Sequence, residues 1–573
     1  MTTARTPSAP ATEATAVAPA GGVGEPTVGQ QRPSRHGLTR PDGLTAVRVL
    51  VWLACAAVII VPLASVVVLA AGGKHLPFLL QGDVVEAGVN SFVSATLSSL
   101  GAVVVGTALA LLFERTDLPG RRVLRLVALS PLLVPPFVGA IAWIGVAGPT
   151  SPLNVWWRGI TGEPLWSVYG GDGVVFLLTV HSYPIALLIV TAAIKRIPAD
   201  LEQAARISGA SAVRALGTVT LPLVRPALIS AFTLIAVSNL ADFGIPSIIG
   251  TPERFVTLST LVYRYLQSGT IDSPLEVVAT IGVVLLAIAL LALVAEMAVS
   301  RRRTELDASS SPPQRLPLGR ARPPVAIVTW GFVLALTLLP LIALLTQALL
   351  PAPGVPLTFE NLTLDNIVRA VTASGTLSAI GNSVMLAGLA GAICVVLGLA
   401  IGALATRTRA RDNGALSAIA LLPQAIPGLV IAVAWLVIAP RIGLFNTPWL
   451  ILAAYVTSFV ALVVQSVGAP LRATPLSAEE AARVSGAGRL RALVDISARM
   501  ALPAALAGGV LVVLSAVREL TLSVLLLSPG SQTLGVAIFN LQQAGAYNAA
   551  SALALLVTIA GLAGLGLAAR SSR

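Results

Sequence analysis

About twelve long apolar segments run through this chain of 573 residues, and they constrain its fold more than any other feature. Each segment is close to the roughly 20 residues that a helix needs to cross about 30 Å of hydrocarbon. The segments are continuous rather than alternating, which favours helices over the strands of a barrel. They fall at about 47–71, 90–113, 124–147, 174–194, 223–247, 275–299, 324–350, 379–405, 415–438, 450–470, 501–527 and 549–569. The sequence therefore predicts an all-α polytopic membrane protein with about 12 transmembrane helices.

The composition and the charge also indicate a membrane protein. Hydrophobic residues make up 56% of the chain and charged residues only 11%, whereas soluble domains are about 25% charged. The net charge of +12 is concentrated in segments that are cytoplasmic if the N-terminus lies inside, as the positive-inside rule requires. We therefore expect a multi-pass protein of the cytoplasmic (inner) cell membrane with both termini in the cytoplasm. We expect its basic residues to contact membrane lipid, and no nucleic acid partner.

The two halves of the chain repeat each other, which indicates a duplicated unit. The matching pairs share one offset of 292 residues: Asn90 and Asn382, Pro131 and Pro423, Pro135 and Pro427, Trp143 and Trp435, and Asn154 and Asn446. Each half contains six predicted spans, an even number, so the halves form two parallel six-helix repeats. The expected divisions are a disordered cytoplasmic tail at 1–44, a first repeat at 45–300, a cytoplasmic linker at 301–323 and a second repeat at 324–573.

A short polar segment also recurs, between the fourth and fifth predicted spans of each half. Residues 202–210 read EQAARISGA and residues 479–487 read EEAARVSGA, at an offset of 277 residues. Lipid-facing residues drift among Leu, Val and Ala at little cost, so two copies of one polar pattern need another reason. They predict two similar docking surfaces for a water-soluble partner.

The local pattern of this segment predicts a helix, a bend and a second helix. We expect the first helix to start just after Pro198 in one copy and just after Pro475 in the other. Gly209 and Gly486 then allow the chain to turn out of that helix. The spacing also predicts i,i+4 ion pairs between Glu202 and Arg206 and between Glu479 and Arg483.

The segment resembles the EAA motif of the permease subunits of bacterial ATP-binding cassette (ABC) importers. The resemblance rests on Gln203, Ala204, Ala205 and Gly209 in the first half and on Glu480, Ala481, Ala482 and Gly486 in the second, preceded by Glu202 and Glu479. In the first copy Gln203 replaces the glutamate of the motif. The resemblance implies that these ten residues couple the membrane spans to ABC ATPase subunits.

Two properly placed copies in one chain resemble a fused double permease, and the arrangement is most similar to the ferric iron branch. That resemblance implies a separate extracytoplasmic solute-binding protein that delivers the substrate. Ferric iron is the favoured substrate, and import of thiamine, a polyamine or a phosphonate is the alternative that the same branch leaves open.

The chain itself lacks the loop that binds nucleotide phosphates. Its two lysines, Lys74 and Lys195, do not end a Gly-x-x-x-x-Gly-Lys-Ser/Thr pattern, so ATP hydrolysis is expected on a separate subunit. We assign no catalytic residue and no cofactor, because the three histidines are scattered and no hydrolase motif accompanies them. A secondary transporter driven by an ion gradient is the alternative class. It would explain the spans and the duplication but not the two coupling-type segments.

Three charged residues fall near the ends of apolar segments and are candidates for the substrate pathway. Asp242 and Glu519 match at the offset of 277 residues, and Arg518 precedes Glu519. A charge at bilayer depth costs about 2.5–3.5 kcal/mol on insertion scales, so such groups usually face a cavity or each other. Two interpretations stay open: the carboxylates line a path for a hard cation or an amine, or Arg518 neutralises one of them as structural support. Metal ligands are left unassigned.

Prolines interrupt the third and ninth predicted spans at matching places. Proline removes a backbone hydrogen bond and leaves carbonyl groups free, which lipid does not tolerate unless protein or a water-filled cavity covers them. The pattern therefore predicts two bends, and both a packing kink and a position beside the translocation path are consistent with it.

Overall fold

The computed structural model describes residues 43–72, 76–269, 271–300 and 315–571. The predicted tail at 1–44 lies outside these residues except for its last two, and 301–314 of the predicted linker lie outside them as well. In the first half the helices are α1 Gly43–Cys55, α2 Val61–Ala70, α3 Gly82–Arg115, α4 Arg121–Leu129, α5 Pro136–Ala147, α6 Pro152–Thr161, α7 Gly171–Ile194, α8 Ala199–Ile207, α9 Ala212–Ala215, α10 Leu221–Leu240, α11 Leu258–Gln267 and α12 Pro274–Ser300. In the second half they are α13 Arg322–Leu349, α14 Asp365–Thr372, α15 Ser374–Arg407, α16 Asn413–Leu421, α17 Gly428–Ile442, α18 Pro448–Ala473, α19 Leu476–Val484, α20 Arg489–Ala492, α21 Arg499–Val517, α22 Thr521–Leu525, α23 Leu534–Gln543 and α24 Tyr547–Ser571.

The predicted all-α polytopic fold is confirmed. Among the described residues, nine helices are long and apolar enough to cross a membrane, and up to eleven spans result if each of two bent helix pairs is one span. The twelfth predicted segment corresponds to α24, Tyr547–Ser571. The chain is therefore a multi-pass membrane protein whose helices satisfy their own backbone groups.

The third and ninth predicted spans are broken at their prolines, as expected. The pair Arg121–Leu133 and Pro136–Thr161 is bent by 106°, and the pair Asn413–Ala425 and Gly428–Ile442 is bent by 107°. A 3-10 turn precedes each break, and a proline occupies the residue before α5 and before α17. Because proline cannot donate a backbone hydrogen bond, the same residue type at the same place produces nearly the same angle in both repeats.

The fifth and eleventh spans are shorter than the sequence suggested. Helix α10 ends at Leu240 instead of continuing to 247, and α21 ends at Val517 instead of continuing to 527. Past each end the chain turns and begins a new short helical element, the π-helix Pro246–Gly250 or α22. The sequence did not indicate that the helix ends here, because the apolar residues continue on both sides of the break, where they are buried.

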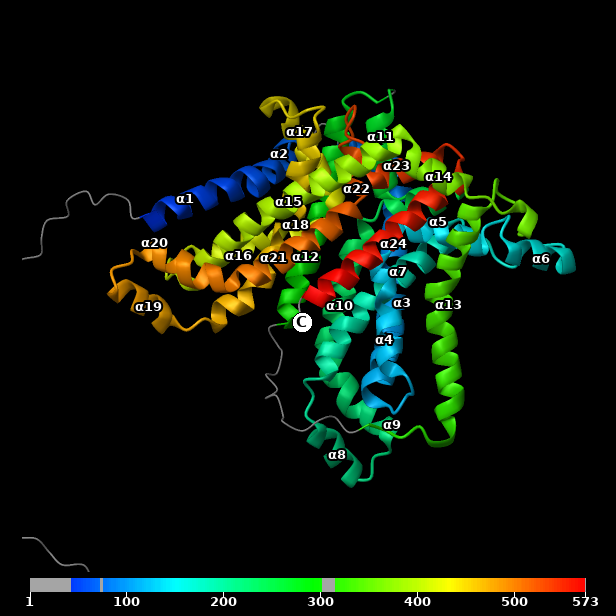
Figure 1. The fold of residues 1–573 in the computed structure, drawn as a ribbon, viewed down its shortest axis with the longest axis horizontal. Coiled ribbons are helices and arrows are strands. Elements are labelled where there is room, and N and C mark those ends of the chain that lie inside the picture. Colours follow the sequence, from blue (N-terminus) through cyan, green and yellow to red (C-terminus); the bar gives the residue numbers. More distant parts are fainter. Residues whose placement is uncertain (1–42, 73–75, 270, 301–314, 572–573) are drawn as a thin grey trace, which may run out of the picture.

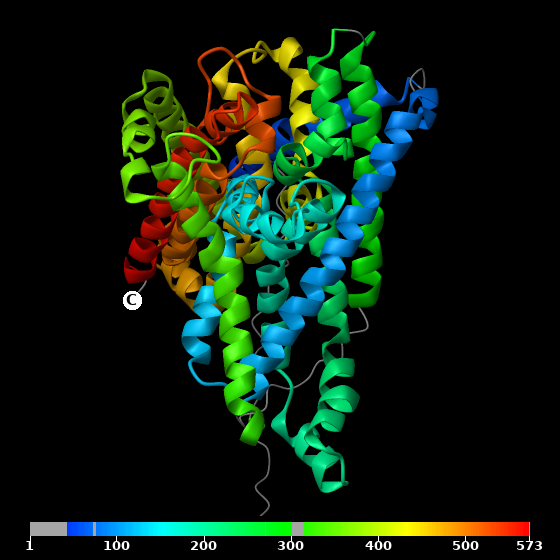
Figure 2. The same ribbon diagram turned by 90° about the vertical axis from the view of Figure 1, so that its right-hand side faces the viewer.

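Each repeat is built on a bundle of three long helices, and the first long helix of each repeat packs on the other repeat. The bundles are α3, α7 and α10 in the first repeat and α15, α18 and α21 in the second. Helices α1 and α2 leave the first repeat to contact α15, α16 and α17, and α13 leaves the second repeat to contact α4 and α5. We call α1–α2 and α13 the crossing helices. Figure 2 shows α13 running alongside the first bundle.

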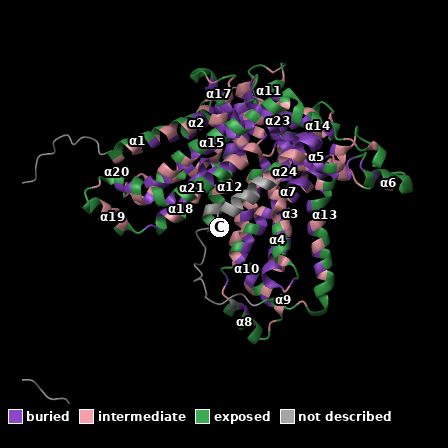
Figure 3. Cartoon of the chain, viewed as in Figure 1, coloured by how far each residue is buried: buried purple, intermediate pink, exposed green. Residues whose placement is uncertain are grey.

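The two bundles meet at one end and spread apart at the other (Figure 1), so that α8 lies at the far end of one bundle and α19 at the far end of the other. Buried residues concentrate where the bundles meet, while α8 and α19 carry mostly exposed and partly exposed residues (Figure 3). Aromatic side chains from both repeats close the meeting point: Phe243 lies 5.5 Å from Phe539 and 5.0 Å from Tyr263, measured between ring centroids. The architecture therefore joins the repeats at one end and leaves the two polar segments apart.

Candidate coupling segments and polar breaks

The repeated polar segment forms the predicted helix, bend and second helix in both repeats. Helices α8 and α19 begin directly after Pro198 and Pro475. Gly209 and Gly486 follow with φ angles of +90° and +94°, in the left-handed region where a Cβ is strained. Both glycines are therefore required by the backbone, and each places a second short helix, α9 or α20, beside the first.

The first glutamate of each copy points inward and not along its own helix. Glu202 Oε1 lies 3.2 Å from Arg115 Nη2, and its side chain is only 10% exposed. Glu479 Oε1 lies 2.7 Å from Arg407 Nε, and the arginine side chain is 4% exposed. The predicted ion pairs to Arg206 and Arg483 are therefore wrong.

A hydroxyl group and backbone carbonyls complete each of these sites. The Thr220 hydroxyl donates to Glu202 and the Ser497 hydroxyl donates to Glu479. Arg407 also donates from Nη1 to the carbonyls of Leu471 and Thr474, at 3.2 and 2.9 Å.

The glutamates pair with Arg115 and Arg407 instead of with an arginine of their own helix because a buried arginine needs a counterion. An exposed i,i+4 pair contributes only about 0.2–0.5 kcal/mol. Arg115 and Arg407 are the last residues of α3 and α15, and we call them the supporting arginines. They connect each copy of the repeated polar segment to the longest helix of its repeat. The sequence reasoning missed them, although they match at the offset of 292 residues.

The outward face of each helix carries small, polar and apolar side chains. Gln203 and Ala204 are exposed on α8, as are Glu480 and Ala481 on α19. A large apolar residue ends each helix almost free of contacts, since Ile207 is 87% exposed and Val484 is 90% exposed. Ala205 and Ala482 are half-buried and belong to the supporting side. Ile207 and Val484 match at the offset of 277 residues, so the two copies expose an aliphatic side chain at the same place.

The two candidate pathway carboxylates both cap the break that follows α10 or α21. Asp242 Oδ1 accepts a hydrogen bond from the Ile245 amide at 2.9 Å. Glu519 accepts from the amides of Leu522 and Ser523 at 2.8 and 3.2 Å. A carboxylate that accepts backbone N–H groups at the start of a helical element is a helix cap. The break itself therefore depends on these residues, and both are only partly buried.

Arg518 does not neutralise either carboxylate. Its Nη2 atom donates instead to the carbonyl of Val134 at 3.1 Å. Val134 precedes Pro135 and belongs to the break in the third span. Arg518 thus satisfies a carbonyl beside a proline break in the opposite repeat, and the interpretation in which it neutralises Asp242 or Glu519 is not supported.

A small cavity lies beside the same proline break. It has a volume of about 60 Å³ and is lined by residues of α13, of α7 and of the broken span, among them Pro131, Val134, His181 and Thr337. The walls are mostly apolar, and His181 is half-buried there. Among the residues that the structure describes, no group of three or more His, Cys, Asp or Glu side chains could hold a metal ion.

Comparison with known proteins gives the family. The family of binding-protein-dependent transport system inner membrane components matches the chain twice, at residues 102–305 and 395–572. The chain is 24% identical to the Fe(3+)-transport system permease protein FbpB 2 of Haemophilus influenzae, over 85% of this chain and 90% of that protein.

Permeases for other solutes match shorter parts of the chain. The molybdenum transport system permease protein ModB of Escherichia coli is 29% identical over 34% of this chain and 86% of its own length. The trehalose/maltose transport system permease protein MalF of Thermococcus litoralis is 32% identical over 31% of this chain and 62% of its own length. With the double match and the two repeats of its fold, the chain belongs to the family of binding-protein-dependent transport system inner membrane components, as a fused double permease of the ABC importer type.

Proposed function

We propose that this permease forms the translocation pathway for ferric iron, which a separate extracytoplasmic solute-binding protein delivers. The similarity to a ferric permease over 85% of the chain supports iron over the solutes of relatives that match about a third of it. Import of thiamine, a polyamine or a phosphonate is the alternative within the same branch.

The energy for transport comes from ABC ATPase subunits that dock on α8 and α19. The observation that carries this proposal is that the two segments share one construction: an inward glutamate fixed to a supporting arginine, a glycine bend, and an exposed aliphatic tip at Ile207 or Val484. A supported helix transmits a push to the bundle behind it, whereas a loosely attached helix would absorb the push. Closure of the ATPases therefore changes the angle between the bundles and alternates access.

The same proposal fixes the orientation of the chain. Both docking segments are cytoplasmic, so the N- and C-termini are cytoplasmic too, in the cytoplasmic (inner) cell membrane. The divisions 45–300 and 324–573 are then two permease repeats joined by a cytoplasmic linker at 301–323.

The deciding experiment measures uptake of radiolabelled ferric iron in cells that lack this chain, with and without the chain restored, under iron limitation. We expect uptake that depends on the chain and on cellular ATP. Labelled molybdate, thiamine and putrescine are measured in parallel, and chain-dependent uptake of one of them instead of iron would assign that solute. Uptake that persists when no ATPase subunit is present would favour the ion-driven secondary transporter and overturn the proposal.

A further inference from the structure

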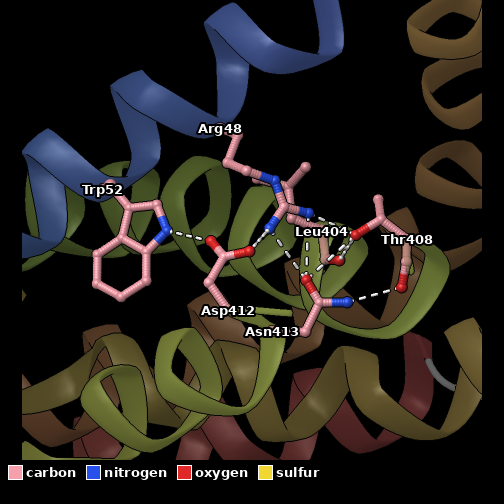
Figure 4. A network of polar contacts seen from close by, with 6 residues as sticks. All are labelled: Arg48, Trp52, Leu404, Thr408, Asp412 and Asn413. Atoms are coloured by element: carbon pink, nitrogen blue, oxygen red, sulfur yellow. Dashed lines mark hydrogen bonds and ion pairs between the residues drawn. The ribbon is translucent and has the colours of Figure 1, made fainter. Parts of the chain in front are cut away.

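The crossing helix α1 is fixed to the second repeat by a compact polar network (Figure 4). Arg48 Nη1 lies 2.5 Å from Asp412 Oδ1, and Trp52 Nε1 donates to Asp412 Oδ2 at 2.6 Å. Arg48 also donates to the Thr408 hydroxyl and to Asn413 Oδ1. Two side chains of the first repeat therefore hold the turn between α15 and α16 of the second, and we call this network the Asp412 clamp.

The Asp412 clamp adjoins the second coupling segment. Thr408 directly follows Arg407, the supporting arginine that holds Glu479. The start of α1 reaches α20 as well, because a Cβ on Gly43 would lie 3.2 Å from Leu490 Cδ2. A displacement of α19 or α20 is thus passed to α1 at two places, although α1 belongs to the other repeat.

The first coupling segment has a corresponding clamp at Asp117. Asp117 lies two residues after the supporting arginine Arg115, and its Oδ1 accepts from the Leu318 amide at 2.8 Å. Its Oδ2 lies 3.6 Å from Arg322 Nε at the start of α13.

Neighbouring backbone contacts strengthen this second clamp. The Leu316 amide donates to the Arg115 carbonyl at 2.8 Å, and Trp330 Nε1 donates to the Pro119 carbonyl at 3.4 Å. In both repeats an aspartate just beyond a supporting arginine meets an arginine of the opposite crossing helix, and a tryptophan of that helix donates to the same turn.

We propose that Asp412 and Asp117 are positioning residues that tie each coupling segment to the crossing helix of the opposite repeat, so that movement of one segment moves both repeats. This inference rests on the proposed function and adds to it how the two halves stay in step. An ATPase that pushes α19 displaces Arg407 and the turn at Thr408 together, since they are consecutive residues at the end of one rigid helix. The clamp passes that displacement to α1, and α2 carries it onward to α12 and α17, against which it packs.

The test measures the distance between the two coupling segments with and without nucleotide. The complex with its ATPase is purified through a tag on this chain, placed in lipid nanodiscs and spin-labelled at Arg196→Cys and Ala473→Cys, two exposed positions just before α8 and α19 that lie outside the proposed docking face. The native cysteines, Cys55 and Cys394, are buried, which keeps the labelling selective. With ATP and vanadate, we expect the unaltered chain to give one narrow, shifted distance distribution.

Loss of the clamp is expected to uncouple the halves. Asp412→Ala should leave part of the molecules at the nucleotide-free distance under ATP and vanadate, and Asp117→Ala should do the same from the other side. The exchange Arg48→Asp with Asp412→Arg restores the ion pair and should narrow the distribution again. Arg411→Ala, a charge removed from the exposed neighbouring residue, is the matched control and should leave the distribution unchanged.

Each outcome decides something separate. If the unaltered complex shows no nucleotide-dependent distance change, the proposed function fails and this inference fails with it. If the unaltered complex responds, and Asp412→Ala and Asp117→Ala respond identically to it, the proposed function stands and the clamps do not position the segments. A lower melting temperature with an unchanged distance distribution would likewise reduce the clamps to structural support.

Discussion

Arg407 Nε lies 2.7 Å from Glu479 Oε1 and joins the end of the longest helix in the second repeat to the proposed coupling segment. The first glutamate of the repeated segment is therefore a support, while Glu480 beside it faces outward. The structure therefore distinguishes two effects that the sequence alone does not. Glu479 holds the segment in place, and Glu480 is free to contact a partner.

Removal of the inward carboxylate should destabilise the protein. Glu479→Gln leaves Arg407 nearly buried without its counterion, and breaking a buried pair from one side costs about 3–5 kcal/mol, less here because Glu479 is 15% exposed. We expect a lower melting temperature in detergent and weaker ATPase stimulation. Arg407→Gln combined with Glu479→Gln should cost less than the sum of the single changes, and full additivity would contradict the pairing.

Reversal of the outward charge should act on docking alone. Glu480→Lys alters an exposed residue outside the hydrocarbon, so membrane insertion and melting temperature should stay as they are. The amount of ATPase that copurifies with the tagged chain should fall. Normal ATPase stimulation in this variant would show that Glu480 does not contribute to docking.

The exposed aliphatic tips should contribute to the same interface. Ile207→Ser with Val484→Ser removes two side chains that are 87% and 90% exposed, and burial of each is worth roughly 1.5–3 kcal/mol. ATPase binding, measured by titration in nanodiscs, should weaken at least tenfold. Leu357→Ser, a change at a loop residue that is 56% exposed, is the control. If the unaltered chain, the double variant and the control bind the ATPase equally well, Ile207 and Val484 are not part of the interface.

The glycine bend should tolerate no side chain. Gly486→Ala forces φ near +94° on a residue with a Cβ, at a cost of about 1–2 kcal/mol. We expect reduced coupling, measured as iron transported per ATP hydrolysed in proteoliposomes. Gly488→Ala is the matched control, because Gly488 has a φ of −63° and open space around it. The bend is dispensable if both variants couple equally well.

Substitution of the two capping carboxylates distinguishes a role in the substrate pathway from a purely structural role. Asp242→Asn keeps a side-chain oxygen for the Ile245 amide, since Asn and Asp cap helices about equally well, but it removes the charge. Together with Glu519→Gln, we expect iron uptake to fall several-fold while the melting temperature and ATPase docking are retained. Unchanged uptake would leave the two carboxylates as caps only.

The Asp412 clamp should depend on pH with a definite sign. Hydrogen bonds from Arg48 and then Trp52 hold the pKa of Asp412 below its usual value of 3.8. Its contribution to stability is therefore present above that usual value and is lost as pH falls through the lowered pKa. The difference in melting temperature between the unaltered chain and Asp412→Asn should stay constant from neutral pH down to mild acid and then shrink. A difference that already disappears between pH 7 and 5 would contradict this.

Much of the fold could be predicted from the sequence, because a segment that crosses lipid must be apolar, long enough to span it and hydrogen-bonded within itself. Apolar segments of spanning length predicted the helices, and the matching prolines predicted two bends, which the structure shows with angles of 106° and 107°. Gly209 and Gly486 predicted the turns, since only glycine adopts their φ angles easily. These features depend on local chemistry, so each copy of the repeat could be interpreted by itself.

Only the tertiary structure decided which polar groups meet. The sequence predicted a pair between Glu202 and Arg206 and left a pair between Arg518 and a carboxylate as one of two open interpretations. The fold instead brings Arg115 to Glu202 and Val134 to Arg518. Buried charges and freed carbonyls take the partner that excludes water most completely, and that partner lies 87 residues away in one case and 384 in the other. The sequence also did not predict that α1 and α13 pack on the opposite repeats. An apolar helix packs equally well on any apolar bundle, so only the contacts of its few polar side chains specify the bundle.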